Sequence, residues 1–341
     1  MRAQVVLEPG RMELREVETP RPGEGEVLLR VRRALTCGTD VKTVARGHPK
    51  FPMPTRLGHE YSGEVAAVGR GVRNVREGDS VMLVPSAPCG QCFYCARGDE
   101  NLCETLMEQY AIGGFAEFVL LPARVVRTNL FPKPRGLGYE EAALLEPLSC
   151  VVHGLEMVPI RPDWCVVIVG AGAISALHLL ALRARGVSEV LVVGRGERRL
   201  AHVRAFDPTA VFGGGIAAAR PRVLRHTGGR GADVVVECTG QAEVWAEALS
   251  LVRPGGWLVL FGGCAAGSRV SFDTQRIHYD QIRIVSPFHF TPRAVRKARE
   301  LLVSGAVAAD GLLAEQVPLE DVPRALARQS EGHALKYSVA P

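Results

Sequence analysis

Four closely spaced cysteines constrain this chain more than any other feature of its sequence. Cys89, Cys92, Cys95 and Cys103 follow the pattern C-x2-C-x2-C-x7-C, and such short gaps let one loop place four sulfurs around a single ion. Zinc bound by four thiolates at about 2.3 Å has no position left for water or substrate. We therefore predict a closed, structural zinc site in a lobe at about residues 86–106, with the chemistry of the protein elsewhere.

Two other uses of these cysteines stay open at this point. The C-x2-C-x2-C spacing also occurs in iron–sulfur proteins, although the usual fourth spacing and the proline that follows it are missing here. A disulfide requires an oxidising compartment, and the apolar run of Val5, Val6 and Leu7 is too short for the core of a signal peptide. Zinc is the favoured interpretation, and a cytoplasmic location is expected.

Length and composition predict two domains and exclude several kinds of partner. The chain has 341 residues, of which 47% are hydrophobic, so it can bury more than one core. No stretch approaches the roughly 20 apolar residues that cross a membrane. The net charge is +5, but the arginines are scattered and not interleaved with aromatic residues. We therefore expect neither a nucleic acid nor a membrane as partner.

Hydrophobic periodicity changes along the chain. Short apolar runs at residues 26–35, 60–68, 79–84 and 115–121 predict strands without intervening helices. Continuous apolar strands predicted at 165–169, 189–193, 233–237, 257–261 and 283–285 alternate with helical stretches, which is typical of a parallel sheet covered by helices. Thr291 and Pro292 are expected to open a helix as N-cap and first-turn proline. Four further cysteines in apolar runs are expected to be small buried hydrophobes, namely Cys150, Cys165, Cys238 and Cys264.

A glycine-rich turn follows the strand predicted at 165–169. Gly170 permits a tight bend, Gly172 lets the backbone approach a pyrophosphate, and the helix predicted to follow supplies unpaired amides. Ser175 stands where a third glycine is usual. We predict a dinucleotide site in this context. Its candidate residues include Gly170, Gly172, Ala173, Ile174, Ser175 and, after a later strand, Thr239.

The end of the next strand predicts which dinucleotide binds. NAD-specific sites place Asp or Glu there to bind the ribose hydroxyls, but this chain has Gly194, followed by Arg195 and, nearby, Arg199. A guanidinium can bind a 2′-phosphate that a carboxylate would repel. NADP is therefore favoured over NAD.

A second set of potential metal ligands lies outside the cysteine lobe. Cys37, His59 and Glu146 offer a thiolate, an imidazole and a carboxylate, and Glu60 follows His59 directly. Three such ligands with an open fourth position make a catalytic zinc site. Their distance in the sequence leaves open whether they converge.

With these motifs the chain resembles the zinc-dependent medium-chain alcohol dehydrogenases, especially the polyol (sorbitol-like) and threonine dehydrogenase branch. The resemblance implies a GroES-like β-barrel catalytic domain at residues 1–147, completed by 287–341, and a Rossmann domain at 148–286. It also implies one catalytic and one structural zinc per chain, and a homodimer or homotetramer. The motifs that carry it are Cys37-Gly-Thr-Asp, Gly58-His59-Glu60-Tyr-Ser-Gly63, Gly78-Asp79-Ser-Val81, the cysteine lobe, Gly114-Phe-Ala-Glu-Phe118, Glu146-Pro147-Leu148 and the Gly170 turn.

The resemblance also implies roles at the catalytic zinc. Cys37 and His59 match zinc ligands, while Glu60 and Glu146 compete for the third place. Asp40 matches an aspartate that accepts a hydrogen bond from the ligand histidine and so sets its tautomer.

Three further positions concern the substrate. Thr39 matches a hydroxyl that takes the substrate proton, and Lys42 stands where many relatives have a histidine that passes the proton on. His289 matches a position where sorbitol-type enzymes hold an arginine that contacts substrate hydroxyls.

The activity implied is hydride transfer between NAD(P) and a secondary alcohol of the polyol, sugar-like or cyclitol class. Amino-alcohol oxidation of the threonine 3-dehydrogenase kind is the alternative. A zinc-free quinone or enoyl reductase is disfavoured because it would lack the Cys37, His59 and Glu146 set. A non-enzymatic, zinc-stabilised binding module would not need the glycine turn.

Overall fold

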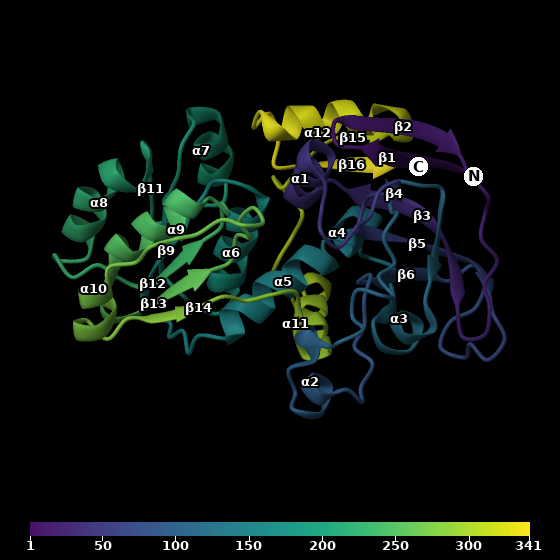
Figure 1. Cartoon of the computed structure of the whole chain (residues 1–341), viewed down its shortest axis with the longest axis horizontal. Helices are drawn as coiled ribbons and strands as arrows, with labels where there is room; N and C mark the ends of the chain where they lie inside the picture. The colour runs from purple at the N-terminus through teal and green to yellow at the C-terminus, as the bar shows by residue number, and fades with distance from the viewer. The chain divides into compact units, whose positions relative to one another are not determined.

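The computed structural model describes all 341 residues, Met1–Pro341. The chain divides into two compact units (Figure 1). Unit 1 contains Met1–Ser149 and Phe290–Pro341, and unit 2 contains Cys150–His289. No helix is both long and apolar enough to span a membrane.

Unit 1 is built on β-sheets. Its strands are β1 (Arg2–Glu8), β2 (Arg11–Glu16), β3 (Val27–Leu35), β4 (Thr55–Arg56), β5 (Glu60–Val68), β6 (Ser80–Leu83), β7 (Phe118–Leu121), β8 (Leu130–Pro132), β15 (Leu313–Pro318) and β16 (Lys336–Ala340). The larger sheet has the order β15-β16-β3-β5-β6-β8 with β7 paired to β3, and the smaller has the order β2-β1-β4. In the middle of β3, Leu29 and Val31 are buried while Arg30 and Arg32 are exposed, so one face of the strand packs against the core.

The C-terminal segment of the chain belongs to unit 1. β16 pairs antiparallel with β3, with Ser338 opposite Leu35, which puts the end of the chain beside one of its first strands (Figure 1). Thr291 caps the helix after it as predicted, since its hydroxyl accepts the Ala294 amide at 3.2 Å. The helices of unit 1 are α1 (Gly38–Arg46), α2 (Phe93–Ala96), α3 (Ala123–Thr128), α4 (Tyr139–Ala143), α11 (Pro292–Val303) and α12 (Val322–Ser330), with 3-10 turns η1 (Glu100–Leu102) and η3 (Leu319–Asp321).

Unit 2 is a parallel sheet covered by helices. Its strands are β9 (Cys165–Val169), β10 (Glu189–Val193), β11 (Ala210–Phe212), β12 (Ala232–Glu237), β13 (Val252–Leu260) and β14 (Arg283–Val285), and its helices are α6 (Ala173–Ala184), α7 (Glu197–Arg204), α8 (Gly215–His226), α9 (Ala242–Ala248) and α10 (Thr274–Tyr279), with a 3-10 turn η2 (Leu249–Leu251). All pairings are parallel, in the order β11-β10-β9-β12-β13-β14. Val167 and Val169 belong to one core cluster with residues of α8 and α9, and Val166 and Ile168, which alternate with them, are equally buried, so both faces of β9 are covered.

The structure corrects two expectations. The first part of the chain is not made of strands alone, because α1 follows β3 directly; its capping residues outweigh the weak apolar pattern of this polar helix. α5 (Leu145–Glu156) is likewise helical. The four cysteines expected to be buried are only partly so; Cys165 begins β9, and Cys238 and Cys264 lie beyond the ends of β12 and β13. The doubly wound parallel sheet is confirmed.

Candidate catalytic and metal sites

Cys37 lies at the junction of β3 and α1. It is the N-cap of α1, and its backbone amide donates to the Asp40 carboxylate at 3.0 Å. The Thr39 amide in turn points at the Cys37 sulfur, at 3.5 Å. This closed turn holds the thiol at the start of the helix.

His59 is buried beside Asp40, just before β5. Its Nδ1 lies 3.3 Å from the Asp40 carboxylate, which also accepts the Gly58 amide at 3.4 Å. Burial lowers the pKa of His59, but the Asp40 carboxylate and the Cys37 thiolate raise it by more, so that its pKa lies well above the usual value. A proton on Nδ1 leaves Nε2 as the atom that can bind a metal.

Glu60, the first residue of β5, completes a three-ligand set. The ligand atoms of Cys37, His59 and Glu60 all lie within 4.8 Å of one another. One thiolate, one imidazole and one carboxylate suit zinc and leave a fourth position for a substrate oxygen. Glu146, on α5, is buried but is not part of this set. Of the two carboxylates that the sequence left in competition, the structure brings only Glu60 to the other ligands.

Lys336 is a residue of this site that sequence reasoning missed. Its side chain is only 1% exposed, and its Nζ lies 2.5 and 2.7 Å from the two carboxylate oxygens of Glu60 and 3.0 Å from the Thr36 carbonyl. Burial acts to lower the pKa of Lys336, but the carboxylate of Glu60 and the thiolate of Cys37 raise it by more. A lysine between Leu335 and Tyr337, at the start of β16, was the available signal, because lysine is almost never fully buried unless paired.

The four cysteines of the lobe also converge. Their sulfurs lie within 4.8 Å of one another, and the two sulfurs of Cys92 and Cys95 are 3.5 Å apart. A disulfide has sulfurs about 2.05 Å apart, and all nine cysteines are free, so the disulfide alternative is excluded.

Electrostatics of the lobe favour a cation among the sulfurs. Backbone amides of Gln91 and Cys92 lower the pKa of Cys89 to about 6, whereas burial raises the pKa of Cys95 to about 12. Thiolates this close repel one another unless a positive ion lies between them. Phe93 and Leu102 in this lobe are 59% and 44% exposed, so a hydrophobic core does little to hold it together.

The glycine turn of unit 2 joins β9 to α6. Gly170 has φ 125°, a conformation that favours glycine, and its amide donates to the Val193 carbonyl at 2.8 Å. Gly172 caps α6, which begins with Ala173 and Ile174. Ser175 is buried, with its hydroxyl facing the turn. The turn thus presents its backbone at a helix N-terminus, as a dinucleotide site requires.

The other predicted cofactor residues follow the neighbouring strands. Gly194 is buried at the end of β10, while Arg195 after it is exposed and lies over the start of α8, where a Cβ on Gly215 would come within 2.6 Å of the Arg195 Nε. Arg199 is half-buried on α7, and Thr239 follows β12. Gly194, Arg195 and Thr239 lie just beyond the carboxyl ends of parallel strands, where such sheets bind ligands.

The predicted substrate residues belong to both units. Thr39 and Lys42 are half-buried on α1, about one turn apart. His289 is the last residue of unit 2, and it has φ 61° in the left-handed region. Such a conformation is uncommon outside glycine and is often kept at functional sites.

Comparison with known proteins decides the family. Residues 23–134 match the alcohol dehydrogenase GroES-like domain, and residues 173–304 match the zinc-binding dehydrogenase family. D-altritol 5-dehydrogenase of Agrobacterium fabrum strain C58 is 33% identical over 94% of this chain and 94% of its own length. The chain belongs to the zinc-dependent alcohol and polyol dehydrogenase family. It is an NAD(P)-dependent alcohol dehydrogenase, as predicted.

Other relatives of this dehydrogenase agree. Sorbitol dehydrogenase of Bacillus subtilis strain 168 is 29% identical and covers 100% of this chain and 97% of its own length. The alcohol dehydrogenase TADH from Thermus sp. ATN1 superposes with a TM-score of 0.89 at 29% identity, over 100% of this chain and 99% of that one. A Sinorhizobium meliloti 1021 protein described as a zinc-binding dehydrogenase bound to NADP gives 0.88 at 29% identity, with the same coverage. The predicted pairing of GroES-like and Rossmann domains is confirmed.

A substitution at Lys336 tests whether Glu60 is the carboxylate that binds zinc in this dehydrogenase. Lys336→Met is expected to destabilise the metal-free protein by about 3–5 kcal/mol, because Glu60 then stays buried without a cation. Bound zinc places a positive charge beside the Glu60 carboxylate and should restore most of the lost stability. Thermal unfolding with EDTA and with zinc checks this: the zinc-induced rise in Tm should be larger in Lys336→Met than in the wild type or in the exposed-lysine control Lys50→Met. Equal rises in all three proteins would contradict the expectation.

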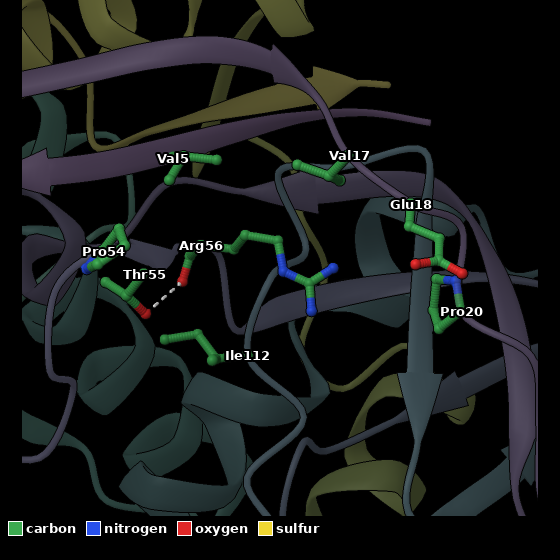
Figure 2. A pocket seen from close by; sticks show the side chains of 8 residues that line it. All are labelled: Val5, Val17, Glu18, Pro20, Pro54, Thr55, Arg56 and Ile112. Atoms are coloured by element: carbon green, nitrogen blue, oxygen red, sulfur yellow. Dashed lines mark hydrogen bonds between the residues drawn. The ribbon is translucent and has the colours of Figure 1, made fainter.

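A surface pocket of unit 1 has a different position from the metal site. It has a volume of about 460 Å³. In Figure 2 the Arg56 side chain extends toward the side of the pocket that carries Glu18 and Pro20. No predicted site residue lines it, and its walls carry neither a thiol nor an imidazole. The pocket is lined by Val5, Val17, Glu18, Pro20, Pro54, Thr55, Arg56 and Ile112.

Proposed function

We propose that this dehydrogenase oxidises a secondary alcohol of the polyol, sugar-like or cyclitol class with NADP as hydride acceptor, and catalyses the reverse reduction at the same site. The convergence of Cys37, His59 and Glu60 within 4.8 Å carries the proposal. When bound there, zinc supplies Lewis-acid polarisation of the alcohol oxygen, and the nicotinamide supplies the hydride acceptor. A second, structural zinc is proposed for the four-cysteine lobe.

The residues around the ligands supply orientation and proton transfer. Asp40 holds the His59 ring in the tautomer that leaves Nε2 free for a metal. The Thr39 hydroxyl, two residues after Cys37, is proposed to accept the substrate proton, and Lys42 on the same helix to continue the relay.

A polyhydroxylated substrate is supported by the relatives and by one residue of this chain. The relatives described above include an altritol and a sorbitol dehydrogenase. A polyol presents hydroxyls beyond the one that reacts, and the His289 imidazole is proposed to bind one of them, since both of its nitrogens can take part in hydrogen bonds.

Metal analysis combined with turnover tests the function. The protein purified without oxygen should contain two zinc ions per chain, and it should turn over with NADP⁺ on members of a panel of secondary alcohols, polyols, aminocyclitols and threonine. Activity confined to threonine would replace the polyol proposal with amino-alcohol oxidation. Zinc in the lobe but no turnover with any member and either cofactor would overturn the enzymatic proposal.

Preference for NADP is proposed on the arginines after β10. Gly194 places no carboxylate at the ribose position, and the exposed Arg195 follows it directly, with its guanidinium beside Gly215 at the start of α8. A charged hydrogen bond of this kind contributes about 1.5–3 kcal/mol, or about 10- to 100-fold in affinity.

Arg195→Asp is therefore expected to lower the ratio of kcat/KM for NADP⁺ to that for NAD⁺ by about 10- to 100-fold, because the carboxylate repels the 2′-phosphate. Steady-state kinetics with both cofactors measures the ratio. Arg225→Asp, at an exposed position in the last turn of α8, is the matched charge control and should leave the ratio unchanged. If Arg195→Asp leaves it unchanged too, this account of the cofactor preference is wrong.

A further inference from the structure

Glu237 is a buried carboxylate to which the metal site and the proposed proton relay assign no role. It is the last residue of β12 and is fully buried. One of its carboxylate oxygens accepts both the amide of Thr239, at 2.6 Å, and the hydroxyl of Thr239. The other accepts the amide of Gly240 at 3.2 Å. A single side chain thus sets the conformation of the turn that leaves β12.

The backbone of Glu237 holds a second loop. Its carbonyl accepts the amides of Phe261 at 3.0 Å and Gly262 at 2.9 Å, just after β13. A Cβ added to Gly240 would lie 2.4 Å from the Gly263 carbonyl oxygen, and one added to Gly262 would lie 2.2 Å from the Gly240 nitrogen. The two loops are therefore in backbone contact, with no space for side chains between them.

The same turn also touches the glycine turn after β9. A Cβ on Gly170 would lie 3.4 Å from the Cβ of Cys238 and 3.4 Å from the methyl group of Thr239. β9 and β12 are neighbours at the point where the strand order of the sheet reverses. Ligands of doubly wound sheets bind in the crevice outside the carboxyl ends of the strands at that point. The two loops that Glu237 holds and the Gly170 turn that Cys238 and Thr239 touch form this end of the sheet.

The hydrogen-bond partners of the Glu237 carboxylate indicate that it positions the turn after β12. Burial raises the pKa of Glu237, and no cation pairs with its carboxylate; its partners are N–H and O–H donors of the adjoining turn and the side chain of Trp245 on α9. An apolar side chain would fill the same volume without the cost of burying a carboxylate. What it could not do is hold three donors of one turn in place.

We propose that Glu237 is a positioning residue for cofactor binding, which locks the Thr239–Gly240 turn against the Gly170 turn and so preforms the dinucleotide crevice. This inference rests on the proposed NAD(P) site. It makes no claim of direct contact between Glu237 and the cofactor. Its consequence is that disturbing the clamp weakens cofactor binding more than it slows the hydride step.

The test replaces the clamp with the nearest neutral side chain. Glu237→Gln can keep both bonds from Thr239 on its amide oxygen, but its NH₂ group then faces the Gly240 amide and cannot accept from it. We expect the Kd and the KM for NADP⁺ to rise about tenfold, the effect of losing one charged hydrogen bond, with kcat and zinc content changed little. Glu237→Asp, which keeps the charge on a shorter side chain, should recover part of the binding.

A packing variant on the same strand separates positioning from general stability. Val235 is fully buried on β12, two residues before Glu237 and on the same face. Val235→Ala should lower Tm and leave the Kd for NADP⁺ unchanged. Tight NADP⁺ binding by Glu237→Gln, or equal weakening in both variants, would overturn this inference while the proposed function stands. A wild-type protein that binds neither NADP⁺ nor NAD⁺ would overturn both.

Discussion

Replacing Glu60 by alanine is expected to remove the zinc proposed for Cys37 and His59, whereas Glu146→Ala is expected to retain it. Only Glu60 lies within ligand distance of the other two residues. Loss of Lewis-acid assistance, worth several kcal/mol, should lower kcat by about a thousandfold or more. Glu146→Ala should slow turnover to a much smaller extent, since the metal stays bound.

Zinc content after dialysis, measured beside kcat for both variants, checks this contrast. Glu60→Ala also leaves Lys336 buried without its carboxylate, so Glu60→Gln, which keeps an oxygen for that lysine, is the control for general destabilisation. Glu60→Ala and Glu60→Gln should both lose the zinc ion. Zinc loss from Glu146→Ala together with its retention in Glu60→Gln would exchange the roles of the two carboxylates.

Removing one ligand of the lobe, as in Cys95→Ser, is expected to unfold the lobe and leave the catalytic zinc in place. Structural zinc contributes about 10–16 kcal/mol of apparent binding energy in zinc-finger peptides, and this lobe has little apolar core to replace it. The variant should hold one zinc fewer per chain than the wild type.

Limited proteolysis measures the state of the lobe. New cleavage should be confined to residues 86–106, with the rest of the chain resistant. The control is Cys165→Ser, at a half-buried cysteine on β9 that belongs to neither group of metal ligands. It should keep the wild-type metal content and the wild-type cleavage pattern. An unchanged lobe in Cys95→Ser would show that the four sulfurs do not depend on a shared ion.

Both predictions concern metal sites, but they were not equally accessible from the sequence. The lobe places its four ligands within a span that one loop can close, so their spacing alone predicts a common ion. The same holds for the turn at Gly170, where a strand, two glycines and a helix follow one another directly. Continuous apolar strands likewise predicted a parallel sheet, because only burial on both faces explains them.

The catalytic set depends on contacts between distant parts of the chain. Cys37 lies two residues after the end of β3 and Glu60 begins β5, and they meet because β3 and β5 pair antiparallel with Leu35 opposite Glu60. This register brings Glu60 to Cys37, which is why Glu60 is proposed as the third ligand in place of Glu146. The first two strands, β1 and β2, were missed because their short apolar run is followed by alternating charged residues.

By itself, the sequence determined the local chemistry: which residues can bind a metal or approach a pyrophosphate, and in which kind of element they lie. Those properties depend on neighbours within a few residues. Only the tertiary structure decided that Lys336, 276 positions after Glu60, is the cation buried against it, and that Glu237 joins the loops after β12 and β13. Strand register and the packing of side chains from separate elements set such contacts, and no local pattern encodes them.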